Sequence, residues 1–168
     1  MEKLIFYLRR IGNIINEFCK VVLGIQIFIM TSVIVIQVFL RLFTNNILYW
    51  ADELSRYLFI WIAMLGSSVA SRSLLHIGVD ILTDALKGKS KKLIQIISYI
   101  CLFVVLTIII ISGAQQTLKQ INQKAITMPF SMAWIFISIP VLGVLMMYYS
   151  LIQFLELIYY GRIDRLHY

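Results

Sequence analysis

The polar side chains with the spacing to do chemistry lie between residues 50 and 80, within otherwise apolar sequence. They are Trp50, Asp52, Glu53, Arg56, Trp61, Gly66, Arg72, His76 and Asp80. On a helix, Asp52 or Glu53 can pair with Arg56, because residues three or four apart share a face. Arg72, His76 and Asp80 follow at intervals of four, so a continued helix would place them on one side. Asp80 could then orient or charge His76.

Three interpretations of this set are open. Arg56 and Arg72 can be anchors that extend toward the membrane surface, as charges at the ends of spans commonly do. The set can instead be an interface with another protein chain. Buried acids and histidines in membranes also form proton relays, here through Glu53 and His76.

Other site chemistries find little support. Haem ligation needs suitably placed histidines, and the chain has only His76 and His167. Cys19 and Cys101 do not have the spacing of a metal or redox motif. The sequence shows no glycine-rich phosphate loop and no nucleophile triad. We therefore expect no cofactor, no metal site and no enzymatic activity.

The elements that position these residues follow from four uncharged stretches, which cover residues 21–40, 57–71, 93–118 and 125–155. A helix of about 20 residues crosses a bilayer core of about 30 Å. The second stretch has only 15 residues, so the span needs its polar ends to reach the interfaces. We expect an all-α integral membrane protein with spans at about 19–41, 52–75, 93–118 and 129–155.

Composition agrees with this assignment. Hydrophobic residues make up 61% of the 168 residues, and the mean hydropathy is +0.89. Four spans leave no room for a separate soluble domain, so we expect residues 1–168 to form one domain. The net charge of +7 comes from basic residues at span ends, which favours contact with phospholipid headgroups over nucleic-acid binding.

Basic residues also predict the orientation. The segment before the first span, the segment 72–92 and the tail together carry eleven Lys and Arg residues, against four in the other two loops. The positive-inside rule then places both termini in the cytoplasm.

Apolar residues recur on one face of residues 3–18: Leu4, Leu8, Ile11, Ile15 and Phe18. This spacing predicts an amphipathic helix lying at the membrane interface. The alternative is an extension of the first span. In that span, Gln26 and Gln37 lie three turns apart and are expected to face another helix.

Two further features concern packing within the later spans. Gly66 and the serines near it make the second half of span two small-sided, so it is expected to pack against protein. Pro129 is expected to open the fourth span, and Pro140 to kink it.

The run from Trp50 to Arg56 (Trp-Ala-Asp-Glu-Leu-Ser-Arg), then Trp61, Gly66, Arg72 and the run from His76 to Asp80 (His-Ile-Gly-Val-Asp), resembles one membrane-protein family. This family is the small membrane subunit of tripartite ATP-independent periplasmic (TRAP) transporters. Met128-Pro129 and Ile139-Pro140-Val141 are also similar. The similarity covers the four-span layout, and its specific part is residues 50–80.

The resemblance implies a non-catalytic scaffold subunit in the bacterial inner membrane. Such systems import organic acids, typically sialic acid or C4-dicarboxylates. The implied partners are a large membrane subunit, which would hold the substrate and sodium sites, and a periplasmic solute-binding protein that docks transiently. Asp52, Glu53 and Arg56 would lie near the docking face or against the large subunit, and Gly66 and the serines near it would allow close packing with the large subunit. Arg72, His76 and Asp80 would fix the inner end of span two, with a lipid headgroup as a further candidate contact.

Two rival functions come from other classes. A small four-helix proton-coupled antiporter depends on an acid deep in span one, where this chain has Gln26 and Gln37 instead. An accessory anchor subunit of a respiratory complex is the other alternative.

Overall fold

The computed structural model describes residues 2–44, 48–84 and 89–160; the side chains of 4, 44, 73–84, 89–91 and 160 are outside the description. The described residues form five helices: α1 (Glu2–Thr44), α2 (Tyr49–Asp84), α3 (Lys89–Lys119), α4 (Ala133–Phe136) and α5 (Ser138–Tyr160). A single isolated β-bridge, between Lys124 and Ser131, accompanies them in this part of the chain.

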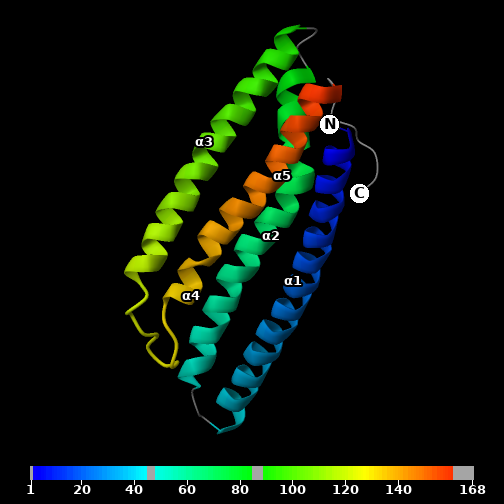
Figure 1. Ribbon diagram of the computed structural model, residues 1–168. Helices are drawn as coiled ribbons and strands as arrows, with labels where there is room; N and C mark the ends of the chain where they lie inside the picture. Colours follow the sequence, from blue (N-terminus) through cyan, green and yellow to red (C-terminus); the bar gives the residue numbers. More distant parts are fainter. Residues whose placement is uncertain (1, 45–47, 85–88, 161–168) are drawn as a thin grey trace.

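The four long helices run alternately up and down along the bundle (Figure 1). The start of α1 and the end of α5 lie at the same end, beside the end of α2 and the start of α3. Four segments are long and apolar enough to cross a membrane: Ile5–Phe43, Tyr49–Arg72, Lys92–Lys119 and Ala133–Tyr159. The prediction of an all-α protein with four spans is confirmed.

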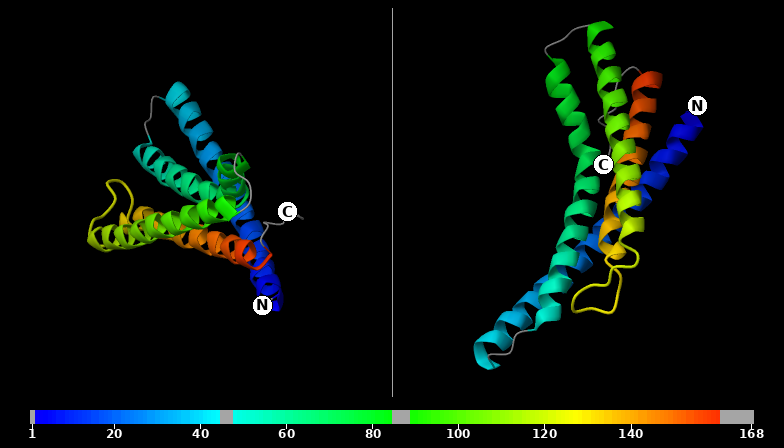
Figure 2. Two further views of the ribbon diagram at one scale, coloured as in Figure 1. Left: turned by 90° about the horizontal axis from the view of Figure 1, so that it is seen from above. Right: turned by 90° about the vertical axis from the view of Figure 1, so that its left-hand side faces the viewer.

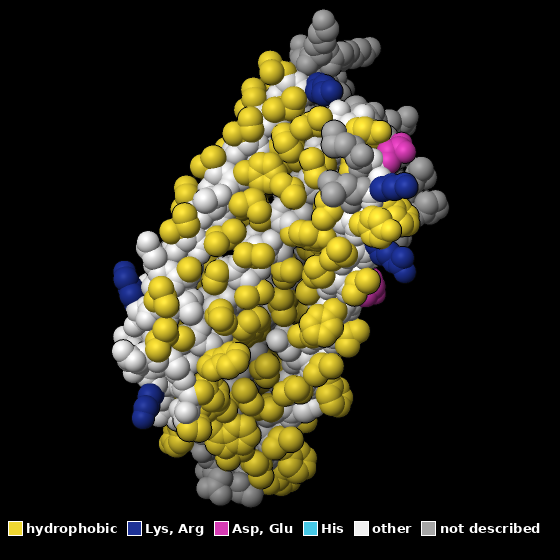
Figure 3. Space-filling view, in the orientation of Figure 1, with side chains coloured by type: hydrophobic (Ala, Val, Ile, Leu, Met, Phe, Trp, Pro, Cys, Tyr) yellow, Lys and Arg dark blue, Asp and Glu magenta, His cyan; other side chains and the backbone are white. Residues whose placement is uncertain are grey.

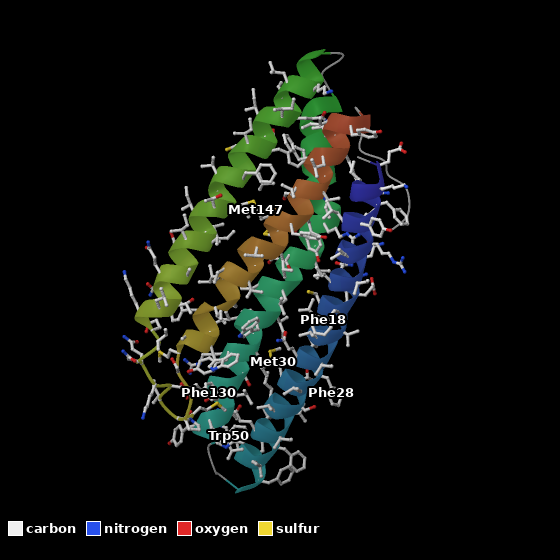
Figure 4. All side chains as sticks on the ribbon, in the orientation of Figure 1. Phe18, Phe28, Met30, Trp50, Phe130 and Met147 are labelled. Carbon is white, nitrogen blue, oxygen red and sulfur yellow. The ribbon has the colours of Figure 1, made fainter. Side chains whose placement is uncertain are left out.

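The surface of the bundle is apolar along most of its length, as a lipid-facing surface requires. In Figure 3, hydrophobic side chains cover most of the visible face, and the charged ones lie toward its margins. Phe18 and Phe28 of α1 point away from the other helices and are 68% and 74% exposed (Figure 4). Exposed aromatic rings of this kind suit a bilayer core better than water.

The N-terminal segment differs from the prediction. Residues 3–18 and the first span form one continuous helix, α1, of 43 residues and about 65 Å. The helix boundary predicted near residue 19 is wrong, because the segment continues into the first span without a break; its extension into the cytoplasm stays a prediction. No proline lies in this segment, so nothing in the backbone ends the helix there. Whether the segment lies at the membrane interface stays a prediction.

The face of this segment that packs against protein differs from the apolar face predicted to lie in the membrane. Ile11 and Phe18, on the predicted apolar face, are exposed. The buried residues lie seven, four and three positions apart: Ile5, Gly12, Asn16 and Cys19. This face packs against α5, where a Cβ on Gly12 would lie 3.4 Å from Ile152 and from Tyr148.

The fourth span begins later than predicted and is interrupted. Pro129 does not open it but lies in the connection between α3 and α4. The helical segment starts at Ala133 and breaks at Ile137, between α4 and α5. Pro140 has no N–H for the carbonyl of Phe136, four residues earlier, so the α-helical ladder is broken there. The local bend predicted from Pro140 is thus present as a break.

Helices α3 and α5 make the most extensive contact in the bundle, because two glycines remove side chains from it. A Cβ on Gly113 would lie 2.8 Å from Ile139 and 2.9 Å from the Pro140 ring. A Cβ on Gly143 would lie 2.6 Å from Ile110. Figure 2 shows α3 and α5 close together, while the far half of α1 diverges from them and keeps α2 as its neighbour.

Candidate functional site at the two ends of the second helix

The predicted site residues separate into two clusters along α2. The Glu53 cluster lies at its start and contains Gln37, Asp52, Glu53, Tyr57 and the backbone of 126–127. The Arg72 cluster lies about five turns further along and contains Arg9, Gly12, Asn13, Arg72, Tyr148, Tyr149, Gln153 and Glu156.

Glu53 holds the connection between α3 and α4 in place. The backbone N–H groups of Ile126 and Thr127 donate to its two carboxylate oxygens, at 2.9 and 2.7 Å. The hydroxyls of Thr127 and Tyr57 donate to the same carboxylate. Glu53 is 9% exposed, and four donors satisfy a buried charge without a cation. The residue therefore acts as a structural anchor within this chain.

Asp52 and Arg56 do not form the ion pair that their helical spacing allows. Asp52 accepts a hydrogen bond of 2.7 Å from the Gln37 amide of α1, so the prediction that Gln37 faces another helix is confirmed. The predicted pairing of Arg56 with Asp52 or Glu53 is wrong: among the described residues Arg56 forms no ion pair and is exposed. Glu53 has local backbone donors instead, which leaves the guanidinium facing outward.

The tryptophans of the site have different environments. Trp50 lies at the start of α2 and is 44% exposed (Figure 4). The Trp61 indole N–H donates to the carbonyl of Trp134 at 3.0 Å, which ties α2 to α4. The two helices enclose an apolar groove of about 250 Å³, lined in part by Tyr57, Trp61 and Phe130.

The second half of α2, which is rich in small residues, has one face buried in the bundle and another that is open. Ser68 and Ser71 are buried inside this chain's own bundle, so they pack against protein as predicted, but the implied packing of these two serines against the large subunit is wrong. Each donates its hydroxyl to a carbonyl of its own helix three residues earlier. Gly66 lies on another face, and a Cβ there would meet no atom within 4 Å. Gly66 therefore has no packing role within this chain.

Arg72 is the centre of the second cluster and is 8% exposed. Its guanidinium donates to the Gly12 carbonyl at 3.4 Å and to the Asn13 side chain. The guanidinium carbon also lies 5.7 Å from the centroid of the Tyr149 ring, within cation–π range. The side chain thus joins α2 to α1 and α5, which differs from a snorkelling anchor.

An ion pair that the sequence analysis missed completes this cluster. Both Nε and Nη2 of Arg9 lie 3.0 Å from Oε1 of Glu156, which connects the first helix to the last. The Tyr148 hydroxyl donates to the Leu8 carbonyl at 2.9 Å, one turn before Gly12. The only hint in the sequence is that Glu156 is an isolated acid at the end of a long apolar stretch, which requires a cation when buried.

The Arg72 cluster also reaches α3. The Gln153 amide donates to the Arg72 carbonyl at 3.1 Å, and the Tyr99 hydroxyl donates to Gln153 Oε1 at 3.4 Å. Tyr99 and Gln153 are 1% and 3% exposed. A buried hydrogen-bonded chain therefore links α1, α2, α3 and α5, and fixes their relative positions.

His76 and Asp80 lie on α2, which continues to Asp84, so the predicted continued helix is present. Their side chains lie outside the described residues, and the proton relay stays a prediction. Among the described residues, no group of His, Cys, Asp or Glu has the arrangement to hold a metal ion.

The fold and the site together define a multi-pass membrane protein whose buried polar groups join its own helices. The family model described as "Tripartite ATP-independent periplasmic transporters, DctQ component" matches residues 30–159. The chain belongs to this family, as the resemblance of residues 50–80 predicted.

Individual relatives agree with the family assignment. The chain is 30% identical over 145 residues to the sialic acid TRAP transporter permease protein SiaT of Haemophilus influenzae, covering 81% of this chain and 22% of that protein. It is 28% identical to the sialic acid TRAP transporter small permease protein SiaQ of Vibrio cholerae, covering 86% and 82%. It is 25% identical to the C4-dicarboxylate small permease protein DctQ of V. cholerae, covering 55% and 40%.

Proposed function

We propose that this chain is the non-catalytic scaffold subunit of a sodium-coupled TRAP importer of organic acids. The solute would be of the sialic acid or C4-dicarboxylate type, as the names of the relatives suggest. The large subunit would hold the solute and sodium, and a periplasmic solute-binding protein would dock transiently. The chain would lie in a bacterial inner membrane with both termini in the cytoplasm.

The observation that supports a scaffold role most directly is how the buried charges are used. Glu53 receives four donors, and Glu156 is paired with Arg9. Arg72 donates to two groups of α1. A carrier needs charged groups that can exchange partners with a passing solute or ion. Here these groups hold helices and the α3–α4 connection in place.

The Haemophilus relative supports a lasting association with a larger membrane unit. This chain spans only 22% of that permease, so there a similar segment is covalently joined to a much longer remainder. In the present chain, the exposed apolar surface of α1 between Val21 and Phe43 offers a wide area for such contact.

Reconstitution tests the proposal. Proteoliposomes would contain this chain, a large TRAP membrane subunit, or both, with the binding protein outside and a sodium gradient. We expect uptake of labelled sialic acid or C4-dicarboxylate only with both membrane proteins and sodium. Uptake by this chain alone would contradict the scaffold role. Uptake by the large subunit alone at the full rate would show that the chain is not needed.

A further inference from the structure

The apolar groove between α2 and α4 lies on the outside of the bundle. Its volume is about 250 Å³, and its walls include aliphatic and aromatic side chains from Leu54, Leu58, Trp61, Phe130, Trp134 and Ile135. Trp134 is 65% exposed, so this wall of the groove is open to the surroundings. Both helices belong to segments that are long and apolar enough to cross a membrane. In a bilayer, an open groove on such segments meets acyl chains.

Two polar groups on the groove walls are already used inside the chain. The Trp61 N–H donates to the Trp134 carbonyl at 3.0 Å, and the Tyr57 hydroxyl donates to Glu53. Figure 4 shows Phe130 beside α2, and its ring centroid lies 5.9 Å from that of Tyr57. A polar ligand would lose hydrogen bonds to water against these walls, whereas an apolar one would not.

The groove also has a suitable depth in the membrane for a lipid tail. Leu54 and Trp61 lie about 8 and 18 Å along α2 from its first residue, Tyr49. Tyr49 and Trp50 are exposed at that end, as aromatic residues at a membrane interface commonly are. The volume is below the range of about 300–1,000 Å³ typical of small-molecule pockets. A single flexible chain therefore suits the groove better than a compact solute.

A lysine lies beside the groove at the same end. Lys124 pairs with Ser131 in the isolated β-bridge, and the Ala125 N–H donates to the Phe130 carbonyl at 3.0 Å. The backbone of Lys124 is therefore next to one wall of the groove. Lys124 is exposed and forms no ion pair within the part of the chain that the structure describes. An amphiphile with its tail in the groove can place an anionic group near this ammonium.

We propose that the groove binds one acyl chain of a phospholipid, whose phosphate is held by Lys124. The tail covers apolar surface of α2, of α4 and of the connection before α4 at the same time. The lipid thereby joins three parts of the chain at this end of the bundle. This site does not depend on the proposed transport function, because every residue it uses belongs to this chain.

Brominated lipid tests the proposal, because bromine quenches tryptophan fluorescence on contact. The chain has three tryptophans, and two of them, Trp61 and Trp134, line the groove. In a Trp50→Phe background the emission comes from these two alone. The purified full-length chain in detergent would be titrated with phosphatidylglycerol that carries a dibrominated acyl chain. We expect quenching that saturates at one lipid per chain.

Two substitutions with matched controls test the two contacts separately. Leu58→Phe places a ring in the groove and should remove the saturable quenching, whereas Leu151→Phe, on the exposed surface of α5, should not. Lys124→Gln should raise the lipid concentration at half-maximal quenching about fivefold. Lys119→Gln, which is also exposed, should leave it unchanged. With a dibrominated diacylglycerol, which lacks the phosphate, Lys124→Gln should have no effect.

Three results would overturn the proposal. Quenching that rises with added lipid without saturating would show only general contact of lipid with the surface. Equal effects of Lys124→Gln and Lys119→Gln would remove the phosphate contact. The titration is also repeated on the complex with a large TRAP membrane subunit, where the saturable quenching should persist. Its loss there would show that protein, rather than lipid, covers the groove in the transporter.

Discussion

The Arg9–Glu156 ion pair should be the interaction whose loss most weakens the attachment of α1 to α5. Arg9→Ala would leave the Glu156 carboxylate, whose side chain is 4% exposed, without its cation in a low-dielectric environment. Removing one partner of a buried pair costs about 3–5 kcal/mol, and the lower end applies because Arg9 itself is 34% exposed. We therefore expect a loss of about 3 kcal/mol in the free energy of unfolding.

The assay is unfolding of the purified chain by titration with SDS, followed by tryptophan fluorescence. Arg10→Ala is the matched control, because Arg10 is the neighbouring residue, has the same charge and is exposed without a described partner. Its effect should stay within about 0.5 kcal/mol. The swapped pair, Arg9→Glu with Glu156→Arg, should recover part of the lost stability.

The reasoning would be refuted if Arg9→Ala and Arg10→Ala had equal effects. Recovery in the swapped pair no better than the sum of the two single substitutions would show that the charges do not interact. Either result would mean that the N-terminal part of α1 is held by its other contacts, which are the hydrogen bonds from Arg72 and Tyr148 and its apolar packing.

Four further predictions concern other parts of the bundle. Gly113→Ala should lower the free energy of unfolding by about 1–3 kcal/mol, because its Cβ would lie 3.1 Å from the Pro140 backbone nitrogen. That nitrogen cannot move without separating α3 and α5. Gly66→Ala should leave the isolated chain as stable as the wild type and reduce co-purification of the large subunit. Glu53→Gln should speed hydrogen exchange at the two amides it binds in the α3–α4 connection, because the new amide nitrogen cannot accept from them; unchanged exchange would contradict the anchor role. Arg56→Ala should not change unfolding of the isolated chain, and any loss of uptake with the assembled transporter would place Arg56 at a contact with another protein.

The spans could be predicted from the sequence because they depend on local information. An uncharged stretch of sufficient length is a property of consecutive residues, and helices satisfy their backbone within one segment. The end assigned to residues 3–18 was an error of interpretation, since the segment lacks any residue that stops a helix. The break before Ser138 has a local cause too, because Pro140 excludes one particular backbone hydrogen bond.

The partners of the charged residues could not be predicted in the same way. Glu53 binds backbone groups 73 and 74 residues away, and backbone N–H groups carry no signature of their own in a sequence. Arg72 binds Gly12 and Asn13, 60 and 59 residues away. Helical spacing instead suggested partners on the same helix, such as Arg56 for Glu53. In the structure, Glu53 binds groups far away in the sequence and does not bind Arg56.

The predicted site residues fall into two groups, according to whether their side chains bind another part of the chain. Asp52, Glu53, Trp61 and Arg72 each have a hydrogen-bond partner on another element of the chain. A substitution at any of these four should first weaken the folded chain, so its effect on transport would be hard to interpret.

Trp50, Arg56 and Gly66 face outward, and none of them contributes a described hydrogen bond to the fold. A side chain that the fold does not use remains available to a binding partner, and its substitution changes assembly without changing stability. These three positions are therefore where loss of partner binding can be measured separately from loss of the native bundle.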